Sequence, residues 1–109
     1  MQSPLQELET TYFRLQTQIN MIGLACQTQQ ERDALTTQYV RSRQNYWACV
    51  NKAFHDDDPQ VISLTNQIEQ ANRKISNLDQ EMGDIAKVIT DITNVVTIGT
   101  QLAAKVISV

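Results

Sequence analysis

The only histidine of the chain stands beside three consecutive aspartates, in the stretch His55-Asp56-Asp57-Asp58. Carboxylate oxygens and an imidazole nitrogen are ligands that divalent cations accept, so a metal site is one interpretation of this cluster. Neighbouring residues of a short turn point in different directions, however, and calcium loops alternate their ligands over about twelve residues. Asp58 before Pro59 has the form of a helix N-cap followed by proline at the first helical position. We therefore interpret the cluster as a turn between two helices and predict no metal ligand in it.

No other combination of residues indicates an enzyme. The sequence has a single histidine and lacks a CxxC pair, a glycine-rich phosphate loop and an HExxH motif. We predict a non-enzymatic protein with no catalytic residue and no cofactor. A net charge of −3 argues against nucleic-acid binding, which requires a concentrated excess of positive charge.

The elements on either side of the turn are predicted from two runs of residues spaced alternately three and four apart. The first run follows Ser3-Pro4, another cap and proline pair, and consists of Leu5, Leu8, Tyr12, Leu15, Ile19, Ile22 and Cys26. In the same register the run first crosses a polar gap at Gln29, Asp33 and Thr36. It then continues at Val40, Arg43, Trp47, Val50 and Phe54. Because no glycine or proline lies between Leu24 and Phe54, the pattern predicts one helix over about 4–54.

The second run keeps the same spacing without a charged residue. It consists of Val61, Leu64, Ile68, Ala71, Ile75, Leu78, Met82, Ile85, Ile89, Ile92, Val96, Gly99, Ala103 and Val106. The pattern predicts a helix over about 59–106, capped by Asp58.

Two such helices joined by a turn at about 55–58 must fold back on each other. The predicted fold is all-α: residues 1–109 form one domain, an antiparallel two-helix coiled-coil hairpin about 70–75 Å long. A two-helix rod has a thin core, and the chain carries more apolar residues than one seam uses. We therefore expect further burial, most simply in a homodimer that forms a four-helix bundle, or against a helical partner protein.

The predicted partner-binding residues lie off the seam or in the aromatic cluster near the turn. They are Tyr39, Trp47, Val88, Val95, Ile98, Leu102 and Ile107. Ser3 and Asp58 are predicted as helix caps. Cys26 and Cys49 are interpreted as buried thiols, with a crosslink between chains as the alternative.

The C-terminal segment gives an alternative function. Residues 85–109 are apolar and contain the small pair Gly99 and Ala103, so a membrane-active protein that inserts this end is the second hypothesis. Asp91 and Lys105 interrupt the segment, which argues against a permanent span. The N-terminus has neither a basic region nor an apolar core, so we expect a cytoplasmic protein or export without a Sec-type signal peptide.

The predicted hairpin resembles, in architecture alone, small helical proteins of bacterial secretion systems such as WXG100-type secreted factors and type III needle subunits or chaperones. The stretch Trp47-Ala48-Cys49 lacks the glycine of the WXG motif and falls inside a predicted helix, so no residue roles are transferred. The leading hypothesis is a protein-protein interaction module that acts through its coiled-coil seam and apolar open end, as a chaperone, assembly adaptor, secretion-associated protein, or immunity or inhibitor protein.

Overall fold

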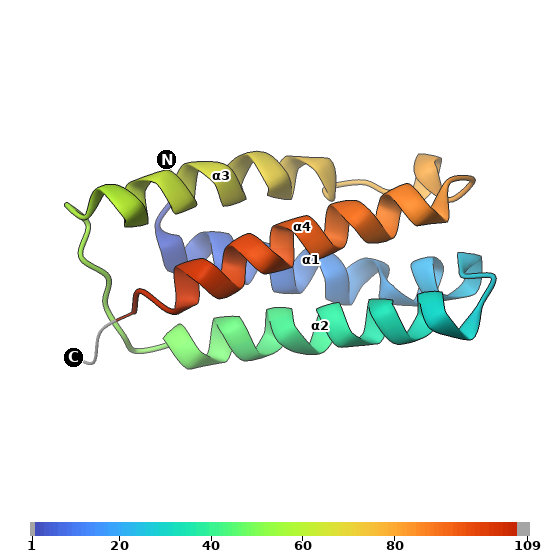
Figure 1. Cartoon of the computed structure of the whole chain (residues 1–109), viewed down its shortest axis with the longest axis horizontal. Helices are drawn as coiled ribbons and strands as arrows, with labels where there is room; N and C mark the ends of the chain where they lie inside the picture. The colour runs from blue at the N-terminus through green and yellow to red at the C-terminus, as the bar shows by residue number, and fades with distance from the viewer. Residues whose placement is uncertain (1, 107–109) are drawn as a thin grey trace.

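The computed structural model describes residues 2–106, and this part of the chain contains four α-helices. Their bounds are Pro4–Ala25 for α1, Gln29–Cys49 for α2, Pro59–Lys74 for α3 and Ile85–Ala103 for α4, and a short 3-10 helix, η1, covers Asp79–Glu81. The helices pack side by side into an elongated bundle (Figure 1). The prediction of an all-α protein is confirmed.

The chain forms two antiparallel helix pairs within the bundle. α1 pairs with α2 and α3 pairs with α4, while residues 50–58 cross from the α2 side to the α3 side (Figure 1). α1 packs against each of the other α-helices, and α4 packs against both α2 and α3. α1 and α4 therefore occupy the middle of the bundle, with α2 and α3 on opposite sides of it.

The predicted single helix over 4–54 is wrong, because the chain reverses at residues 26–28 between α1 and α2. A capping box causes the break. The Thr28 hydroxyl accepts the backbone N–H of Glu31 at 3.1 Å, and the Glu31 carboxylate accepts the backbone N–H of Thr28 at 3.1 Å. These contacts satisfy N–H groups that have no partner at a helix start, so a new helix begins here without a glycine or proline.

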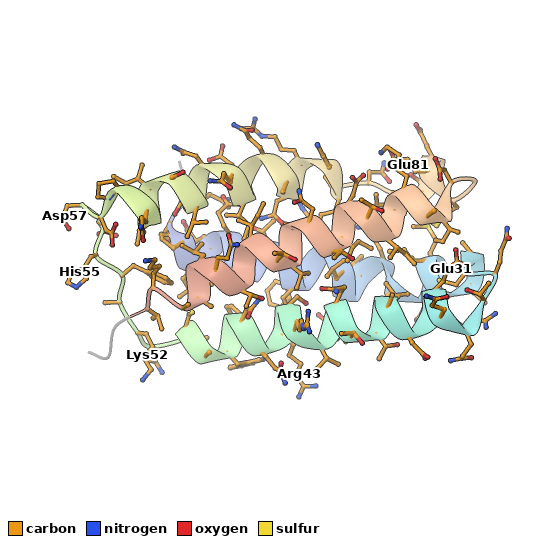
Figure 2. All side chains as sticks on the ribbon, viewed as in Figure 1. Glu31, Arg43, Lys52, His55, Asp57 and Glu81 are labelled. Carbon is orange, nitrogen blue, oxygen red and sulfur yellow. The ribbon has the colours of Figure 1, made fainter. Side chains whose placement is uncertain are left out.

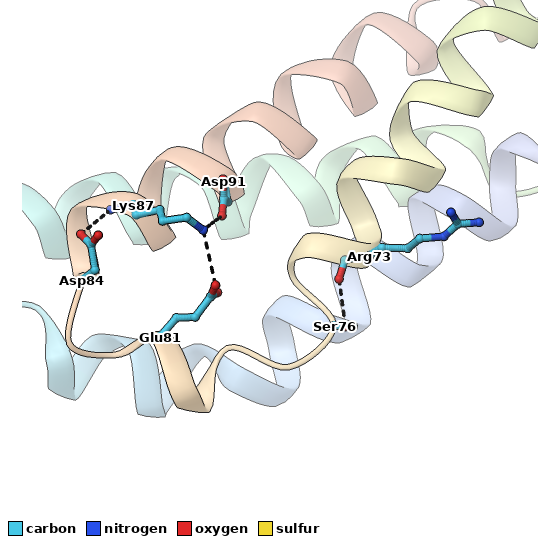
Figure 3. Close-up of polar contacts among 6 residues, drawn as sticks. All are labelled: Arg73, Ser76, Glu81, Asp84, Lys87 and Asp91. Carbon is cyan, nitrogen blue, oxygen red and sulfur yellow. Dashed lines mark hydrogen bonds and ion pairs between the residues drawn. The ribbon is translucent and has the colours of Figure 1, made fainter.

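The predicted helix over 59–106 is also wrong, because residues 75–84 separate α3 from α4. This segment contains η1 and Gly83, and it ends at Asp84, whose carboxylate caps α4 by accepting the backbone N–H of Lys87 at 3.3 Å. Figure 3 shows Lys87 reaching back across the connection. Its Nζ atom lies 3.4 Å from the Glu81 carboxylate and 3.0 Å from the Asp91 carboxylate. Since Lys87 is half exposed, these ion pairs orient the segment more than they stabilise it.

The bundle is much shorter than the predicted rod of about 70–75 Å. Its Cα atoms extend over 43 × 21 × 19 Å. The residues of the second apolar run nevertheless supply the core as expected, since every one of them is buried or partly buried. The chain thus forms a four-helix bundle from a single copy, and the thin core that suggested a dimer does not occur in this fold.

In α2 the predicted seam faces solvent. The residues of that register are all exposed, namely Gln29, Asp33, Thr36, Val40, Arg43 and Trp47. The buried face of the helix consists instead of Leu35, Gln38, Ser42 and Cys49. The polar gap in the sequence therefore marks a change in the phase of the apolar face between α1 and α2.

A buried polar cluster holds α1 against α3. The Asn72 side-chain amide donates to the carbonyl oxygen of Glu7 at 3.0 Å and to its carboxylate at 2.9 Å, and it accepts from the Thr11 hydroxyl at 2.6 Å. Further along α1, the Gln18 side chain donates to the carbonyl of Ile75 at 2.8 Å and accepts a backbone N–H just beyond it at 2.9 Å. These contacts fix the register of α1 against the α3 end of the chain, because sliding one helix along the other would break several of them at once.

Candidate functional site

The His55 and aspartate cluster lies at one end of the bundle. His55 and Asp57 point outward there, away from each other (Figure 2), and His55, Asp56 and Asp57 are all exposed. The Asp58 carboxylate accepts the backbone N–H of Gln60 at 2.8 Å and so caps α3. Among residues 2–106, no group of three or more histidine, cysteine or acidic side chains is placed to hold a metal ion. The cluster therefore has the geometry of a turn and a cap.

A polar groove of about 440 Å³ runs between α1 and α3 above the buried Asn72. Its charged side chains already have partners within the chain. The Arg14 guanidinium donates to the carbonyl of Asn72 at 2.6 Å, and Arg73 pairs with Glu69 at 2.7 Å. The groove thus presents no charged group that is poised for a reaction or for a ligand.

The most distinctive surface lies where α1 meets α2. Three large apolar side chains are exposed there: Trp47 at 58%, Phe13 at 46% and Val40 at 42%. The ring of Tyr46 joins the two aromatic members, since its centroid lies 5.3 Å from that of Trp47 and 6.0 Å from that of Phe13. We call Phe13, Val40, Tyr46 and Trp47 the aromatic surface.

The aromatic surface rests on two further rings. Tyr12 is buried, with its centroid 5.9 Å from that of Tyr46 and 5.3 Å from that of Phe13. Tyr39 lies 5.9 Å from Tyr12 and is partly buried. Because each ring contacts the next from the core outward, the exposed rings are held in place by packing within the chain.

Hydrogen bonding and burial raise the pKa values of two phenols of this cluster, Tyr39 and Tyr46. The Tyr46 hydroxyl donates to the Glu9 carboxylate at 3.0 Å, and this bond, together with burial, raises the pKa of Tyr46. Burial is the largest cause of the raised pKa of Tyr39, followed by its interaction with Tyr12. The Tyr46 ring is therefore fixed at both ends, by stacking on one side and by Glu9 at its hydroxyl.

The charges along α2 differ from those of the rest of the chain. Between Asp33 and Asp56 the sequence has no carboxylate, while it carries Arg41, Arg43 and Lys52, which gives this segment a charge of +3 in a chain of net charge −3. Arg43 extends outward from the middle of α2 and Lys52 extends from the end of the bundle (Figure 2). Arg43 thus adds a positive charge on the face of α2 that carries Val40 and Trp47, while Glu9 lies on α1.

The structure brings together only part of the partner-binding set predicted from the sequence. Trp47 is exposed within the aromatic surface and Tyr39 lies beneath it. Val88, Val95 and Leu102 have no exposed area, so in this fold they belong to the core and are not available to a partner. Ile98 is partly buried against the same core, and Ile107 lies outside the described residues.

Phe13 and Val40 were not among the partner-binding residues predicted from the sequence. Phe13 directly follows the seam residue Tyr12, and a large aromatic residue just off an apolar face was a usable signal. Val40 was assigned to the seam of a helix that does not exist as predicted. Val40 is exposed because the apolar face changes phase at the start of α2, and the sequence pattern did not show that change.

Both cysteines are inside the bundle. Cys26 and Cys49 are free thiols and are buried. Burial is the largest cause of the raised pKa of each thiol, and at Cys26 the nearby Glu31 carboxylate adds to it. A raised pKa disfavours the thiolate, so neither cysteine has the character of a nucleophile.

Within residues 2–106, no helix is both long enough and apolar enough to cross a membrane. Comparison with protein-family models, with curated proteins and with solved structures found no match to this chain.

Proposed function

We propose that the chain is a non-enzymatic protein-protein interaction module whose contact surface is the aromatic surface of α1 and α2. The observation that carries this proposal is the exposure of Trp47 and Phe13, whose rings are linked through Tyr46, together with Val40, exposed seven residues before Trp47 on the same face of α2. Tryptophan and tyrosine at the centre of a patch are the residues that most often dominate a binding energy. Chaperone, adaptor and inhibitor proteins all act by such contacts.

The size of the patch supports the same function. Fully buried aromatic side chains cover roughly 150–250 Å² each, so half-exposed rings of Trp47 and Phe13 leave on the order of 100 Å² each in water. With Val40 the total is roughly 300 Å², which matches the largest apolar patches of ordinary monomers, and these are often functional. An apolar area of this size, surrounded by polar residues, could form the core of a protein-protein interface of standard size.

The partner that fits this surface is a helical protein whose contact face carries carboxylates around an apolar centre. Charge complementarity favours such a partner, because Arg43 lies on the same face of α2 as Val40 and Trp47, and the segment that carries it also contains Arg41 and Lys52 but no carboxylate. A helix lying along α2 would place its apolar side chains on Trp47 and Val40 and its carboxylates near Arg43.

A photo-crosslinking amino acid at position 40 tests the proposal in an extract of the cell that makes the protein. Ile62 on α3 is the matched control, because it is also 42% exposed. A helical protein should be captured at position 40 and not at position 62. Equal capture at both positions, no capture, or capture of the chain itself would overturn the proposal.

The captured protein should then be titrated in purified form by isothermal titration calorimetry, because Trp47 is the only tryptophan and its fluorescence is lost in the key variant. Trp47→Ala is expected to weaken binding about thirtyfold, or about 2 kcal/mol, while Ile62→Ala leaves it unchanged. Arg43→Glu should weaken binding and reduce its dependence on salt. Binding that is insensitive to Trp47→Ala would show that another surface is used.

A further inference from the structure

The connection between α1 and α2 consists of residues 26–28 alone, and none of them has a positive φ. Residues 24–28 contain no glycine or proline, and Cys26 has φ −63° and ψ 133° while Thr28 has φ −126° and ψ 157°. Neither residue has a positive φ, so a change of ψ at these residues, with a smaller adjustment of φ at Thr28, brings the segment into the helical region without steric conflict.

Of the other two connections, residues 50–58 include Asn51 at φ 63°, and they lead into Pro59, which has no N–H for a continuous helix. Residues 75–84 form an irregular segment with its own 3-10 turn and with Gly83. Straightening either segment would reorganise a longer stretch of chain than 26–28.

A few side-chain contacts keep this connection bent. The Glu31 carboxylate accepts the backbone N–H groups of Gln27 at 2.7 Å and of Thr28 at 3.1 Å, while the Thr28 hydroxyl caps Glu31. The Arg32 guanidinium donates to the carbonyl of Cys26 at 3.3 Å. In a continuous helix the same N–H groups would bond to carbonyls four residues earlier, so the contacts stabilise the bent form alone.

The surface on which α1 packs is specific, and it consists entirely of residues that follow the 26–28 connection in the chain. α1 packs against α2, α3 and α4 and buries Leu8, Leu15 and Ile22 completely or almost completely. Its polar contacts to Asn72 and to Ile75 define one register. An α1 helix from a second copy of the chain would find every one of these contacts unchanged.

We propose that residues 26–28 are a hinge through which two copies of this chain exchange α1. In the exchanged dimer, α1 and α2 form one continuous helix over 4–49, about 69 Å long at 1.5 Å per residue. Each half of the dimer is then the bundle described above, with α1 from one copy and α2 to α4 from the other. The exchange does not depend on the aromatic surface. In the dimer, Phe13 on α1 of one copy contacts Tyr46 on α2 of the other copy, so the surface is kept.

The test compares two variants with the wild-type chain after refolding from urea at high and low protein concentration. Thr28→Ala combined with Glu31→Ala removes the capping box and so weakens only the bent form. It should raise the dimer association constant about thirtyfold, which corresponds to about 1 kcal/mol in each of two chains. Analytical ultracentrifugation gives the constant.

Gln29→Pro is the second variant, and it is designed to weaken only the continuous helix of the exchanged dimer. Position 29 is the first residue of α2, where proline is favoured, but in a continuous helix it would lose a hydrogen bond and clash with the preceding turn. This variant should remain a monomer with unchanged helix content at every concentration. A capping-box variant that stays monomeric and is merely less stable would overturn the proposal, as would a dimer that persists with Gln29→Pro. Failure here leaves the Trp47→Ala titration unaffected, so the two proposals are tested separately.

Discussion

Replacing Asn72 with alanine tests whether the buried polar cluster determines how α1 docks on α3. The Asn72 side chain is 2% exposed and makes three hydrogen bonds, to two oxygens of Glu7 and to the Thr11 hydroxyl. The variant removes all three and leaves the Glu7 carboxylate, itself almost fully buried, without that donor. The Thr11 hydroxyl keeps its bond to the carbonyl of Glu7 at 3.1 Å and adds little to the loss.

The expected loss is about 3 kcal/mol in the free energy of unfolding. A buried group left without a partner costs about 1–3 kcal/mol, more when it is charged, and the small cavity adds to this. The total free energy of unfolding of a chain of this size is about 5–15 kcal/mol, so the effect is large. With a urea dependence of about 1.5 kcal/mol per molar, the unfolding midpoint should fall by about 2 M.

Urea unfolding followed by circular dichroism and Trp47 fluorescence measures this change. Asn66→Ala is the control, because Asn66 is an exposed asparagine of the same helix and should change stability by less than about 0.5 kcal/mol. Leucine at both Glu7 and Asn72 should recover much of the loss, since no polar group is then left unpaired. A loss below about 1 kcal/mol for Asn72→Ala would refute the role given to the cluster.

Three further predictions concern single residues. Asp58→Ala should lower stability by about 1 kcal/mol through the lost cap, whereas Asp56→Ala should change it by less than about 0.5 kcal/mol; equal effects in urea unfolding would contradict the capping role. Gln38→Leu should raise stability by about 1 kcal/mol, because the Gln38 Oε1 atom is buried without a hydrogen-bond partner among the described residues, and a lower melting temperature would count against this. The pKa values of Tyr39 and Tyr46 are raised on folding, so both phenols add to the free energy of unfolding. This stabilisation is complete below a pH of about 10 and is lost as the pH rises through the pKa values of the folded state. Tyr46→Phe should therefore flatten the decline of stability above pH 10, and an unchanged slope would exclude the Glu9 contact as its cause.

The first run as far as Cys26 and the whole second run predicted the core well, because periodicity reports which face of a helix is buried. They could not show where a helix ends. Between α3 and α4 both helices direct an apolar face to the same core, so the spacing continues across the break. The signals for the breaks were local and polar: Thr28 with Glu31 three residues later, and Asp84 after a glycine. Ser3 and Asp58 were recognised because a proline followed each of them.

The site was harder to predict than the fold because it depends on which residues remain outside the core. Val88, Val95 and Leu102 lie beside the predicted seam, but a four-helix bundle buries two neighbouring stripes of α4 and therefore encloses them. The exposed set depends instead on the phase of α2, which the polar gap shifts by one residue. That shift turns Trp47 and Val40 outward and Leu35 inward.

The polar inner face of α2 explains why the aromatic residues lie where they do. Its buried positions include Gln38 and Ser42, which give little hydrophobic stabilisation, so α2 depends on the contacts of Tyr39 and Tyr46 with Tyr12 to hold it on α1. The same Tyr46 ring supports the exposed Trp47. A partner of the kind proposed would bind the aromatic surface only when α2 is docked, and by mass action it would stabilise that docked state. The proposal therefore predicts that partner binding and the packing of the least apolar helix are coupled through one set of rings.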